Sequence, residues 1–502
     1  MTDYNKKKMY FCIKNKANIM IKFGTDGWRA EIARDFTFEN IRYVALATAK
    51  YILQIAEIKQ KNKPPSKAKR TRPILPACVV GYDTRFLSKE FAYEVAMVIA
   101  SQGVVVHLTD DFASTPQVSF NTKQKGANLG IVITASHNPA QYNGFKIKGT
   151  FGGPATPEQI EAVEQELKKI VAKPPNLKLL PFDDYVEQKM IKFFEHREPY
   201  IRTIKKKIDV DAISDANHKI VFDMMYGAGM KSVEPLQLNA TFIHNEINPL
   251  FGNLGHPEPI AENLTELSHI VKTGNYDVGF AFDGDADRLG AVDHLGNFVD
   301  SQKIFMILLK YFVEVKKKRG AVVKTVSLTS MVDKYCEMKK LDLIETPVGF
   351  KYIAENMNKT SVLIGGEESG GLATNLHIPE RDGIFNAMLL LEVMTVRNKS
   401  LSELCNELDK EFGAYRFMRR DKIVSQKVKD AILNAAQKGI TKIGKDDIIK
   451  TNTKDGYKFY VNNGWVLIRA SGTEPLIRFY AESDSIGRVA ELINEAEKLG
   501  KM

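Results

Sequence analysis

The sequence predicts an α/β fold of consecutive domains with mixed, mostly parallel sheets, followed by a C-terminal α+β domain. Three observations support this prediction. A chain of 502 residues is long enough for roughly three or four domains. From Cys78 to the segment that begins near Gly383, short apolar runs alternate with helix-like segments, which is typical of doubly wound sheets. After Tyr457 the pattern changes to a hairpin, a further strand and a final helix.

The first unit carries helix start and stop signals between its apolar runs. Ser88 is a candidate helix N-cap, and Gly103 lies just beyond the end of that helix. Thr115 and Pro116 begin a second helix, which stops near Gly126. The expected elements are a strand at 78–82, a helix at 88–102, a strand at 104–108, a helix at 115–126 and a strand at 129–133. This order predicts a mostly parallel sheet.

Two further units repeat the pattern. In the first, a strand at Ile220–Asp223 precedes a helix that starts among glycines, and a strand at 277–282 ends in an acidic loop. In the second, apolar runs from Val322 through Ile364 lead to an apolar helix that begins near Gly383. We therefore expect each α/β unit to present one motif at a strand end, where open α/β sheets bind ligands.

The C-terminal part follows a different pattern. Two strand-like segments, Tyr457–Val461 and Trp465–Arg469, flank the turn Asn462–Gly464, which is a hairpin signal. A further strand at Leu476–Ala481 precedes a terminal helix. These elements predict an α+β domain.

The most informative motif, TASHNP at 134–139, follows the buried strand at 129–133. It puts Ser136 on a tight turn closed by Pro139, so that the hydroxyl is presented to a ligand rather than packed. Lys146, a few residues further on, could return a positive charge to the same site. An ordinary Asx-type turn explains this motif equally well when it is taken alone.

The acidic motif DGDADR at 283–288 follows another apolar run and suggests a cation site. Asp283, Asp285 and Asp287 repel one another unless something neutralises them, and their oxygens suit a hard cation. An EF-hand loop is excluded, because Arg288 stands where the loop needs glycine and His294 where it needs glutamate. Mg2+ is favoured over a solvated acidic turn, with Arg288 left to bind a carboxylate or a phosphate oxygen.

Two more motifs contain groups that bind sugars and phosphates. The loop GGEESGG at 365–371 offers two carboxylates, of Glu367 and Glu368, and a hydroxyl, which suit neighbouring sugar hydroxyls. A plain glycine-rich loop is its alternative interpretation. The segment RASGTEP at 469–475 combines an arginine, two hydroxyls and a glycine into a phosphate cradle. It lacks the lysine and the spacing of a Walker A loop.

These four motifs, in this order, resemble those of the α-D-phosphohexomutase superfamily, the phosphoglucomutase/phosphomannomutase group. The resemblance extends from KFGTDGWR at 22–29 to the C-terminal phosphate loop. It implies a phosphohexomutase that interconverts hexose 1-phosphate and hexose 6-phosphate, with glucose preferred and mannose possible. The reaction would use a phosphoserine enzyme, a hexose 1,6-bisphosphate intermediate, Mg2+, and glucose 1,6-bisphosphate as primer. It also implies a central cleft and domains at 1–182, 183–296, 297–402 and 403–502.

The resemblance assigns roles to residues at matching positions. Ser136 is matched to the phosphoserine, whose oxygen would join three aspartates around the metal: Asp283, Asp285 and Asp287. The residues matched to the transfer site are Arg29, His137, Lys146 and Arg288. Those matched to the sugar grip are Glu367 and Ser369, and those of the hinge-side specificity loop are Gly349, Phe350 and Lys351. Those matched to the anchor of the phosphate that is not transferred are Arg469, Ser471, Gly472 and Thr473.

The chain departs from the family pattern in the third unit. Some bacterial relatives end the sugar loop with histidine, where this chain has Gly371, and the segment HIPERDG at 377–383 is closer to the phosphoglucomutase branch. Arg381 replaces a lysine there and, because guanidinium stays protonated, should bind charge rather than shuttle protons. Lys146 and His377 are the candidates for general base, and a packed histidine at a domain seam is the alternative for His377.

Other functions are compatible with parts of the pattern. Phosphoglucosamine mutase is one alternative, and the EES sequence at 367–369 argues against it. A non-catalytic phosphosugar-binding protein would be expected to lack the serine or the acidic loop, and a phosphatase would release free phosphate.

The amino-acid composition limits the partners that the protein is expected to bind and the cellular compartment in which it is expected to occur. The net charge of +10 collects in short runs, Lys61–Arg72 and Lys316–Arg319, without interleaved aromatic residues, so we expect phosphosugar partners and no nucleic acid. The four cysteines form no CxxC pair, which favours a reducing cytoplasm. The sequence has no apolar run long enough for a membrane span. We expect a monomer or homodimer, an extension at 1–19 and an exposed Lys/Pro-rich insertion at 61–76.

Overall fold

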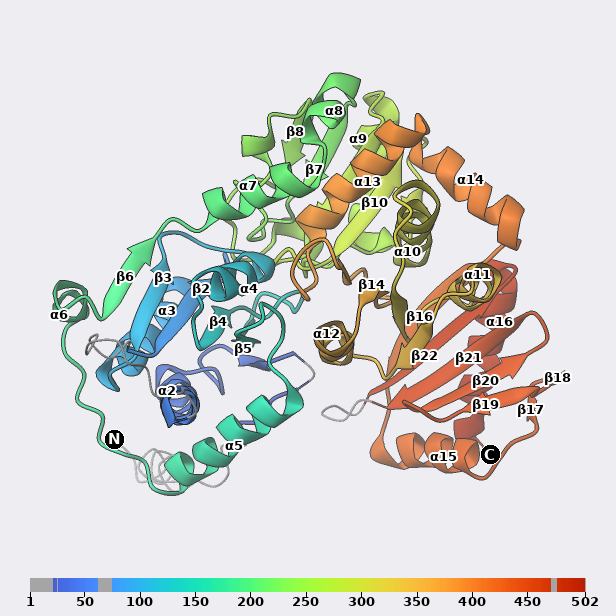
Figure 1. Ribbon diagram of the computed structural model, residues 1–502. Helices are drawn as coiled ribbons and strands as arrows, with labels where there is room; N and C mark the ends of the chain where they lie inside the picture. Colours follow the sequence, from blue (N-terminus) through green and yellow to red (C-terminus); the bar gives the residue numbers. More distant parts are fainter. Residues whose placement is uncertain (1–20, 25, 62–74, 471–475, 502) are drawn as a thin grey trace, which may run out of the picture.

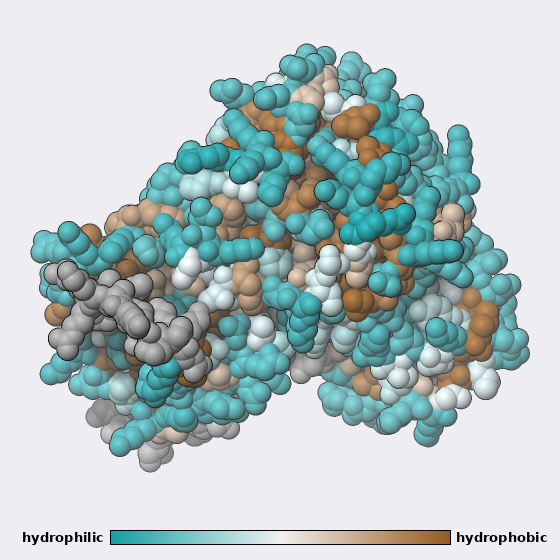
Figure 2. Space-filling view, in the orientation of Figure 1, coloured by the Kyte–Doolittle hydropathy of each residue, from teal (hydrophilic) through white to brown (hydrophobic). Residues whose placement is uncertain are grey.

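The computed structural model describes residues 21–24, 26–61, 75–470 and 476–501. Four larger sheets, and a small one of two strands (β17 and β18), follow one another along the described part of the chain. Figure 1 shows the four domains in an arc from the N-terminal domain (blue) to the C-terminal domain (red). Figure 2 shows the lower edge of the molecule indented between these two end domains. The predicted fold class, with mixed, largely parallel sheets and a distinct C-terminal domain, is confirmed.

The first domain has a six-stranded sheet in the order β1-β5-β4-β2-β3-β6. Strands β2, β3, β4 and β6 are parallel, whereas β5, near one edge, runs antiparallel to both of its neighbours, β4 and β1. Its strands are β1 (Trp28–Glu31), β2 (Ala77–Tyr82), β3 (Val105–Thr109), β4 (Leu129–Ile133), β5 (Tyr142–Gly149) and β6 (Ile191–Phe194). Its helices are α2 (Phe38–Lys61), α3 (Ser88–Ser101), α4 (Thr115–Gln124), α5 (Pro157–Ala172) and α6 (Phe182–Glu187).

The second domain has a five-stranded sheet in the order β11-β10-β9-β7-β8, in which β7 is parallel to both its neighbours. Its strands are β7 (Ile220–Asp223), β8 (Ala240–Ile243), β9 (Val278–Phe282), β10 (Leu289–Asp293) and β11 (Phe298–Val299). Its helices are α7 (Arg197–Lys207), α8 (Val210–Ala216) and α9 (Thr265–Thr273), with short 3-10 turns η1 (Glu234–Leu236), η2 (Gly252–Leu254) and η3 (Ala261–Leu264).

The third domain has a four-stranded sheet in the order β13-β12-β14-β15. Its strands are β12 (Ala321–Thr325), β13 (Leu343–Thr346), β14 (Val362–Gly366) and β15 (Leu372–Thr374). Its helices are α10 (Ser301–Lys310), the π-helical η4 (Tyr311–Val315), α11 (Met331–Lys339), α12 (Phe350–Lys359), α13 (Gly383–Arg397) and α14 (Leu401–Phe412). Helix α13 packs on α8, β9 and β10, so a helix of the third domain covers part of the second sheet (Figure 1).

The C-terminal domain has an antiparallel sheet in the order β16-β22-β21-β20-β19. Most of its buried residues form a hydrophobic core separate from the large core shared by the other three domains. Trp465, Leu467 and Tyr480 instead cluster with Val326 of the third domain. Its strands are β16 (Arg416–Ile423), β17 (Lys442–Ile443), β18 (Asp446–Asp447), β19 (Lys450–Asn452), β20 (Tyr457–Val461), β21 (Gly464–Ala470) and β22 (Leu476–Ser483). Its helices are α15 (Gln426–Gln437), α16 (Ile486–Lys498) and the 3-10 turn η5 (Leu499–Lys501).

Two local predictions are wrong. Ser88 is the first residue of α3 rather than its cap, and its hydroxyl instead donates to the Asp83 carboxylate at 2.6 Å. No helix starts directly after β7, because the backbone there is used to hold the acidic loop. The N–H of Ala228 donates to the carbonyl of Gly284, and a Cβ on Gly227 would lie 2.9 Å from the same oxygen.

The predictions about membrane spans and about the two unusual segments can be compared with the structure only where it describes the chain. There, none of the helices combines the length and apolar character needed to cross a membrane. The expected extension at 1–19, and most of the insertion at 61–76, lie outside the described residues.

Close packing of α4 on the first sheet predicts a stability effect at Gly130 in β4. A Cβ at this position would lie 2.1 Å from Thr122 Oγ1, and Thr122 is itself buried. We expect Gly130→Ala to lower the melting temperature, by an amount equivalent to about 1–3 kcal/mol.

The matched control is Gly487→Ala in α16, where an added Cβ meets nothing within 4 Å. This substitution should leave the melting temperature unchanged or raise it, because alanine favours helix. Equal melting temperatures for wild type and Gly130→Ala would contradict the packing argument.

Candidate active site

The serine turn lies at the carboxyl end of β4 and points its hydroxyl toward the second domain. Ser136 has φ +53°, a left-handed conformation that is uncommon for a residue with a side chain, and its N–H donates to Thr134 Oγ1 at 2.9 Å. The Ser136 hydroxyl donates to Asp283 Oδ2 at 2.8 Å and lies 3.4 Å from His137 Nδ1. The structure therefore brings together the serine and acidic motifs, as the sequence predicts.

Arg85, which sequence reasoning missed, holds the serine turn in place. Its guanidinium is fully buried, lies 3.2 Å from the Asp83 carboxylate, and donates to four backbone carbonyls of the turn and the strand that follows. These carbonyls belong to Ser136, Asn138, Pro139 and Tyr142, at 2.5–3.1 Å. The sequence gives a weak signal, an Asp-Thr-Arg segment directly after a strand, and no indication of its partners.

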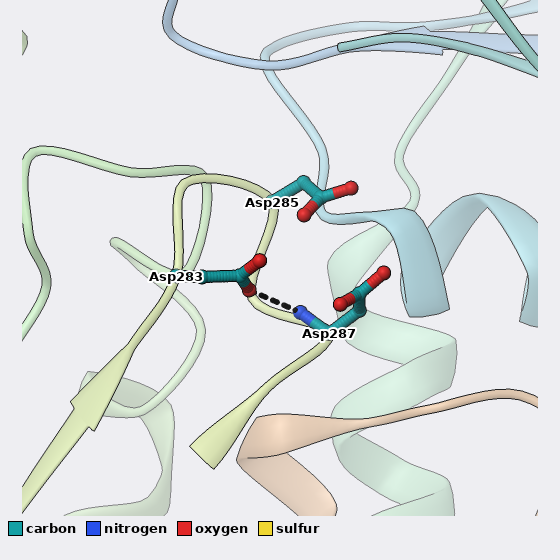
Figure 3. Close-up of side chains that lie close together, drawn as sticks. All are labelled: Asp283, Asp285 and Asp287. Carbon is teal, nitrogen blue, oxygen red and sulfur yellow. Dashed lines mark hydrogen bonds between the residues drawn. The ribbon is translucent and has the colours of Figure 1, made fainter. Parts of the chain in front are cut away.

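The acidic loop connects β9 to β10 and buries three carboxylates together. Figure 3 shows the side chains of Asp283, Asp285 and Asp287 leaving one loop around a common space, and one oxygen of each lies within 4.8 Å of the others. The N–H groups of Asp287 and Arg288 donate to Asp283 Oδ1 at 2.9 and 3.1 Å. Burial and repulsion from the two other aspartates raise the pKa of Asp283.

The acidic loop fits a hard cation. In the described part of the chain, Oδ1 of Asp285 and Oδ1 of Asp287 are buried and have no hydrogen-bond partner. Buried carboxylate oxygens without donors are costly, and oxygen ligands of this kind are the ones Mg2+ prefers. The three aspartates are therefore the residues that would hold a magnesium ion.

Two cations from other domains contact the acidic loop. Lys146 Nζ, from β5, lies 2.8 Å from Asp26, 2.7 Å from Asp285 and 3.2 Å from Asp287. Arg381, just before α13, binds Asp287 at 2.6 Å and also pairs with Asp26. Although burial opposes it, these carboxylates raise the pKa of Lys146. Lys146 is thus a fully buried cation that binds carboxylates, and Arg381 binds charge as the sequence predicts.

His377 lies apart from this cluster, at the junction of α4, α7 and α13. Its ring stacks on Phe385 with centroids 4.6 Å apart and on Phe120 at 5.8 Å, and it also contacts Tyr200. Its Nε2 lies 3.2 Å from Asp382 Oδ2. These contacts are typical of a packed histidine, which is the alternative that the sequence offers to a general base at His377.

The remaining predicted transfer-site residues surround the serine turn. Arg288 donates to Glu258, a carboxylate that sequence reasoning missed, at 2.7 Å, and its Nε lies 4.0 Å from Asp283. Arg29 donates to Asn138 Oδ1 at 2.8 Å. Burial and the neighbouring Arg288 lower the pKa of His137, so its imidazole is neutral at neutral pH.

The sugar loop of the third domain lies beside Arg381. Glu367 is buried with its carboxylate 3.6 Å from the Arg381 guanidinium, and burial raises the pKa of Glu367 to about 7. Glu368 instead accepts a hydrogen bond from Ser327 at 2.5 Å, which fixes it within the domain. Ser369 is half-buried next to Gly370, whose carbonyl accepts from the N–H of Leu289 after the acidic loop.

The specificity loop and Arg469, the first residue of the phosphate motif, lie at the junction of the third and fourth domains. Gly349 has φ +134° before α12, and the Phe350 ring packs 5.5 Å from the Arg381 guanidinium. Lys351 is half-buried, with Nζ over the Tyr352 ring. Arg469 donates through Nε to Asp455 at 2.7 Å. The predicted phosphate ligands Ser471, Gly472 and Thr473 lie outside the described residues.

Comparison with known proteins identifies the family. Four models of phosphoglucomutase/phosphomannomutase domains match the chain: α/β/α domain I at residues 20–173, domain II at 198–296, domain III at 300–412 and the C-terminal domain at 424–499. The chain therefore belongs to the phosphoglucomutase/phosphomannomutase family of α-D-phosphohexomutases, whose members are phosphate-transferring enzymes.

Individual relatives agree on the class and differ in the sugar. A phosphoglucomutase/phosphomannomutase of Thermococcus kodakarensis is 31% identical over 86% of this chain and 90% of its own length. A phosphoglucosamine mutase of Geobacillus thermodenitrificans is 31% identical over 94% and 98%. The crystal structure of a putative phosphomannomutase from Thermus thermophilus superimposes with a TM-score of 0.81 at 31% identity, covering 96% of this chain and 99% of that one.

The raised pKa of Glu367 predicts a pH-dependent stability. The pKa rises from the usual 4.5 to about 7, so near neutral pH the folded protein keeps a proton that the unfolded chain releases. The contribution is complete below pH 4.5 and is lost as pH rises to about 7. Glu367→Gln removes this loss, and its stability relative to wild type should increase over this range by up to about 3 kcal/mol.

Melting temperatures of wild type and Glu367→Gln, recorded from about pH 5 to about pH 8, test this. Other ionisable groups are common to both proteins and cancel in the difference. A difference that stays constant with pH would contradict the raised pKa.

Proposed function

We propose that this enzyme is a Mg2+-dependent phosphohexomutase that interconverts hexose 1-phosphate and hexose 6-phosphate, preferring glucose and accepting mannose. The observation that carries the proposal is the Ser136 hydroxyl, held 2.8 Å from Asp283 at a loop of three buried carboxylates. A serine in this position has a nucleophilic oxygen next to a cation site, which is the arrangement that phosphoryl transfer requires.

The chain's own residues divide the work of transfer. Asp283, Asp285 and Asp287 would hold Mg2+, which when bound neutralises charge on the transferring phosphoryl group. Arg288 and Arg29 add positive charge around the serine turn, and Lys146 and Arg381 keep the carboxylates in place. Three carboxylates surround Lys146 and favour its cationic form, so the proton acceptor is better sought at His137, whose Nδ1 lies 3.4 Å from the serine oxygen.

A hexose 1,6-bisphosphate would be the intermediate between the two phosphoryl transfers of the reaction. Phosphorylated Ser136 transfers its phosphoryl group to the free C6 or C1 hydroxyl of the sugar. The hydroxyl proton passes to the base, and the released serine oxygen takes up a proton. The resulting hexose 1,6-bisphosphate reverses its orientation and returns its other phosphoryl group to Ser136, whose hydroxyl loses its proton while the released sugar oxygen gains one. Glucose 1,6-bisphosphate would prime the unphosphorylated enzyme.

Two binding regions would accept both orientations of the sugar. In the third domain, Glu367 and Ser369 would bind sugar hydroxyls, and the specificity loop would contribute Gly349, Phe350 and Lys351. In the fourth domain, Arg469 would anchor the phosphate that is not transferred, together with Ser471, Gly472 and Thr473. We further propose a domain boundary near 296 and a cytoplasmic monomer or homodimer. The first boundary is better placed after Phe194 than at 182, because β6 pairs with β3 of the first sheet. The third is better placed after α14, which ends at Phe412, than at 402.

Phosphoglucosamine mutase is the second candidate function. The relative from Geobacillus thermodenitrificans carries that name and is aligned over 94% of this chain. The EES sequence of the sugar loop favours glucose over glucosamine by resemblance. The two functions differ only in the sugar, so one assay distinguishes them.

A coupled assay of glucose 1-phosphate conversion tests the proposal, with mannose 1-phosphate and glucosamine 1-phosphate in parallel. We expect turnover that needs Mg2+ and trace glucose 1,6-bisphosphate, ranks glucose first and stops when the metal is chelated. Ser136→Ala should lower kcat at least about 1000-fold, because the nucleophile is lost.

Ser101→Ala is the control, because the Ser101 hydroxyl bonds only to the end of its own helix and to Gln102 in the described structure. Near-normal turnover by Ser136→Ala would overturn the mechanism. Release of free phosphate in place of product would indicate a phosphatase, and silence on all three sugars with a folded protein would contradict hexose mutase activity.

A further inference from the structure

Asp455 lies in the turn before β20 and connects two parts of the proposed substrate site. Its Oδ2 accepts from Arg469 Nε at 2.7 Å and from the N–H of Val348 at 2.9 Å. Arg469 is the proposed phosphate anchor in the fourth domain. Val348 belongs to the stretch TPVGFK at 346–351 in the third domain, which contains the specificity loop and is called the specificity segment below. One carboxylate oxygen therefore joins the two across the domain junction.

We propose that Asp455 is a positioning residue that sets phosphate anchoring and sugar selection together, a role that rests on the proposed function. Binding through Nε fixes the plane of the Arg469 guanidinium, so that a phosphate meets the two Nη nitrogens in one orientation. The same oxygen fixes the backbone of the specificity segment at Val348. A shift of the Arg469 guanidinium is then transmitted through Asp455 to the specificity segment, and a shift of the segment is transmitted to Arg469.

The backbone around Asp455 is itself fixed. Gly456 has φ +83°, and a Cβ there would lie 2.3 Å from the carbonyl oxygen of Ile468 in β21. Only glycine allows the turn to approach the strand this closely. Because the turn is held against the strand that carries Arg469, the carboxylate of Asp455 has a defined position relative to that guanidinium.

A second set of contacts secures the same junction. Asn452 Nδ2 donates to Glu345 Oε1 at 2.7 Å, and Lys454 Nζ donates to the Glu345 carbonyl at 2.7 Å. Glu345 lies near the end of β13, immediately before the specificity segment. Residues 452–455 thus hold the end of β13 and the segment that follows it, and these contacts should keep the junction folded when Asp455 alone is changed.

The ion pair between Asp455 and Arg469 is largely shielded from solvent, so that losing it should have a measurable effect. The side chains of Arg469 and Asp455 are 15% and 22% exposed, and the pair is a charge-assisted hydrogen bond rather than a solvated surface contact. The fourth domain offers a matched pair, Arg488 with Asp446, whose side chains are 18% and 17% exposed. That pair joins α16 to β18 and does not involve Arg469 or the third domain.

Steady-state kinetics with glucose 1-phosphate and mannose 1-phosphate, at fixed bisphosphate, test the role. Asp455→Ala should raise KM for both sugars about 10- to 100-fold, as expected for loss of a charge-assisted bond. It should also bring kcat/KM for the two sugars closer together. Arg469→Ala should raise KM without changing the ratio between sugars, because the specificity segment keeps its bond to Asp455.

Two further variants distinguish positioning from a general loss of structure. Asp455→Asn keeps the shape and one acceptor oxygen, and should recover part of the sugar ratio and of KM. Asp446→Ala should leave both unchanged. An unchanged KM and sugar ratio in Asp455→Ala, with wild type active, would overturn the role of Asp455 and leave the proposed function intact.

Equal effects of Asp455→Ala and Asp446→Ala would likewise overturn it, because they would reflect stability alone. Absence of turnover by wild type on every hexose phosphate contradicts the proposed function itself, and with it the role that rests on it.

Discussion

Three aspartates are buried together on one loop, and the compensation of their charges determines how the first three domains pack. Asp283, Asp285 and Asp287 place their charges within a few ångströms of one another in the protein interior. Each buried ion costs several kcal/mol unless partners compensate it. Lys146 and Arg381 supply that compensation from the first and third domains. The acidic loop is therefore stable only where three domains meet.

Backbone contacts at glycines bring these domains close enough. A Cβ on Gly284 would lie 2.4 Å from the carbonyl oxygen of Ser136, and one on Gly383 would lie 2.4 Å from that of Arg288. The N–H of Gly383 also donates to the carbonyl of Ala286. The serine turn, the acidic loop and the start of α13 thus touch through their main chains. The glycines permit this approach, and the charges of the side chains make it favourable.

Much of the fold and of the site follows from local sequence patterns. The strands before the serine turn and the acidic loop coincide with apolar runs, and each motif lies at the carboxyl end of its strand, as the sequence predicts. The two strands belong to different sheets, and the bond between Ser136 and Asp283 shows that these strand ends face each other. The helix expected after β7 fails to form because that backbone binds Gly284. A segment that is distant in the sequence decides whether the backbone after β7 forms a helix. Local helix propensity alone therefore could not predict this outcome.

The residues that sequence reasoning missed also depend on contacts between segments that are distant in the sequence. Arg85 and Glu258 act through partners far away in the chain, and no motif encodes those contacts. Asp26 lies in the quoted segment 22–29, but nothing in that segment indicates its contact with Lys146. The charge state of Lys146 is a further case. An amine near a reacting serine suggests a base, whereas three carboxylates around it make it a cation. Only the tertiary structure distinguishes the two.

The most direct test of the account is to follow the phosphoryl group on the serine. The enzyme would be incubated with Mg2+ and glucose 1,6-bisphosphate labelled with 32P, digested, and its peptides identified by mass spectrometry. We expect label on the peptide that contains Ser136, and transfer of that label to sugar when unlabelled glucose 6-phosphate is added. Label on another residue, or label on Ser136 that the sugar does not remove, would contradict it.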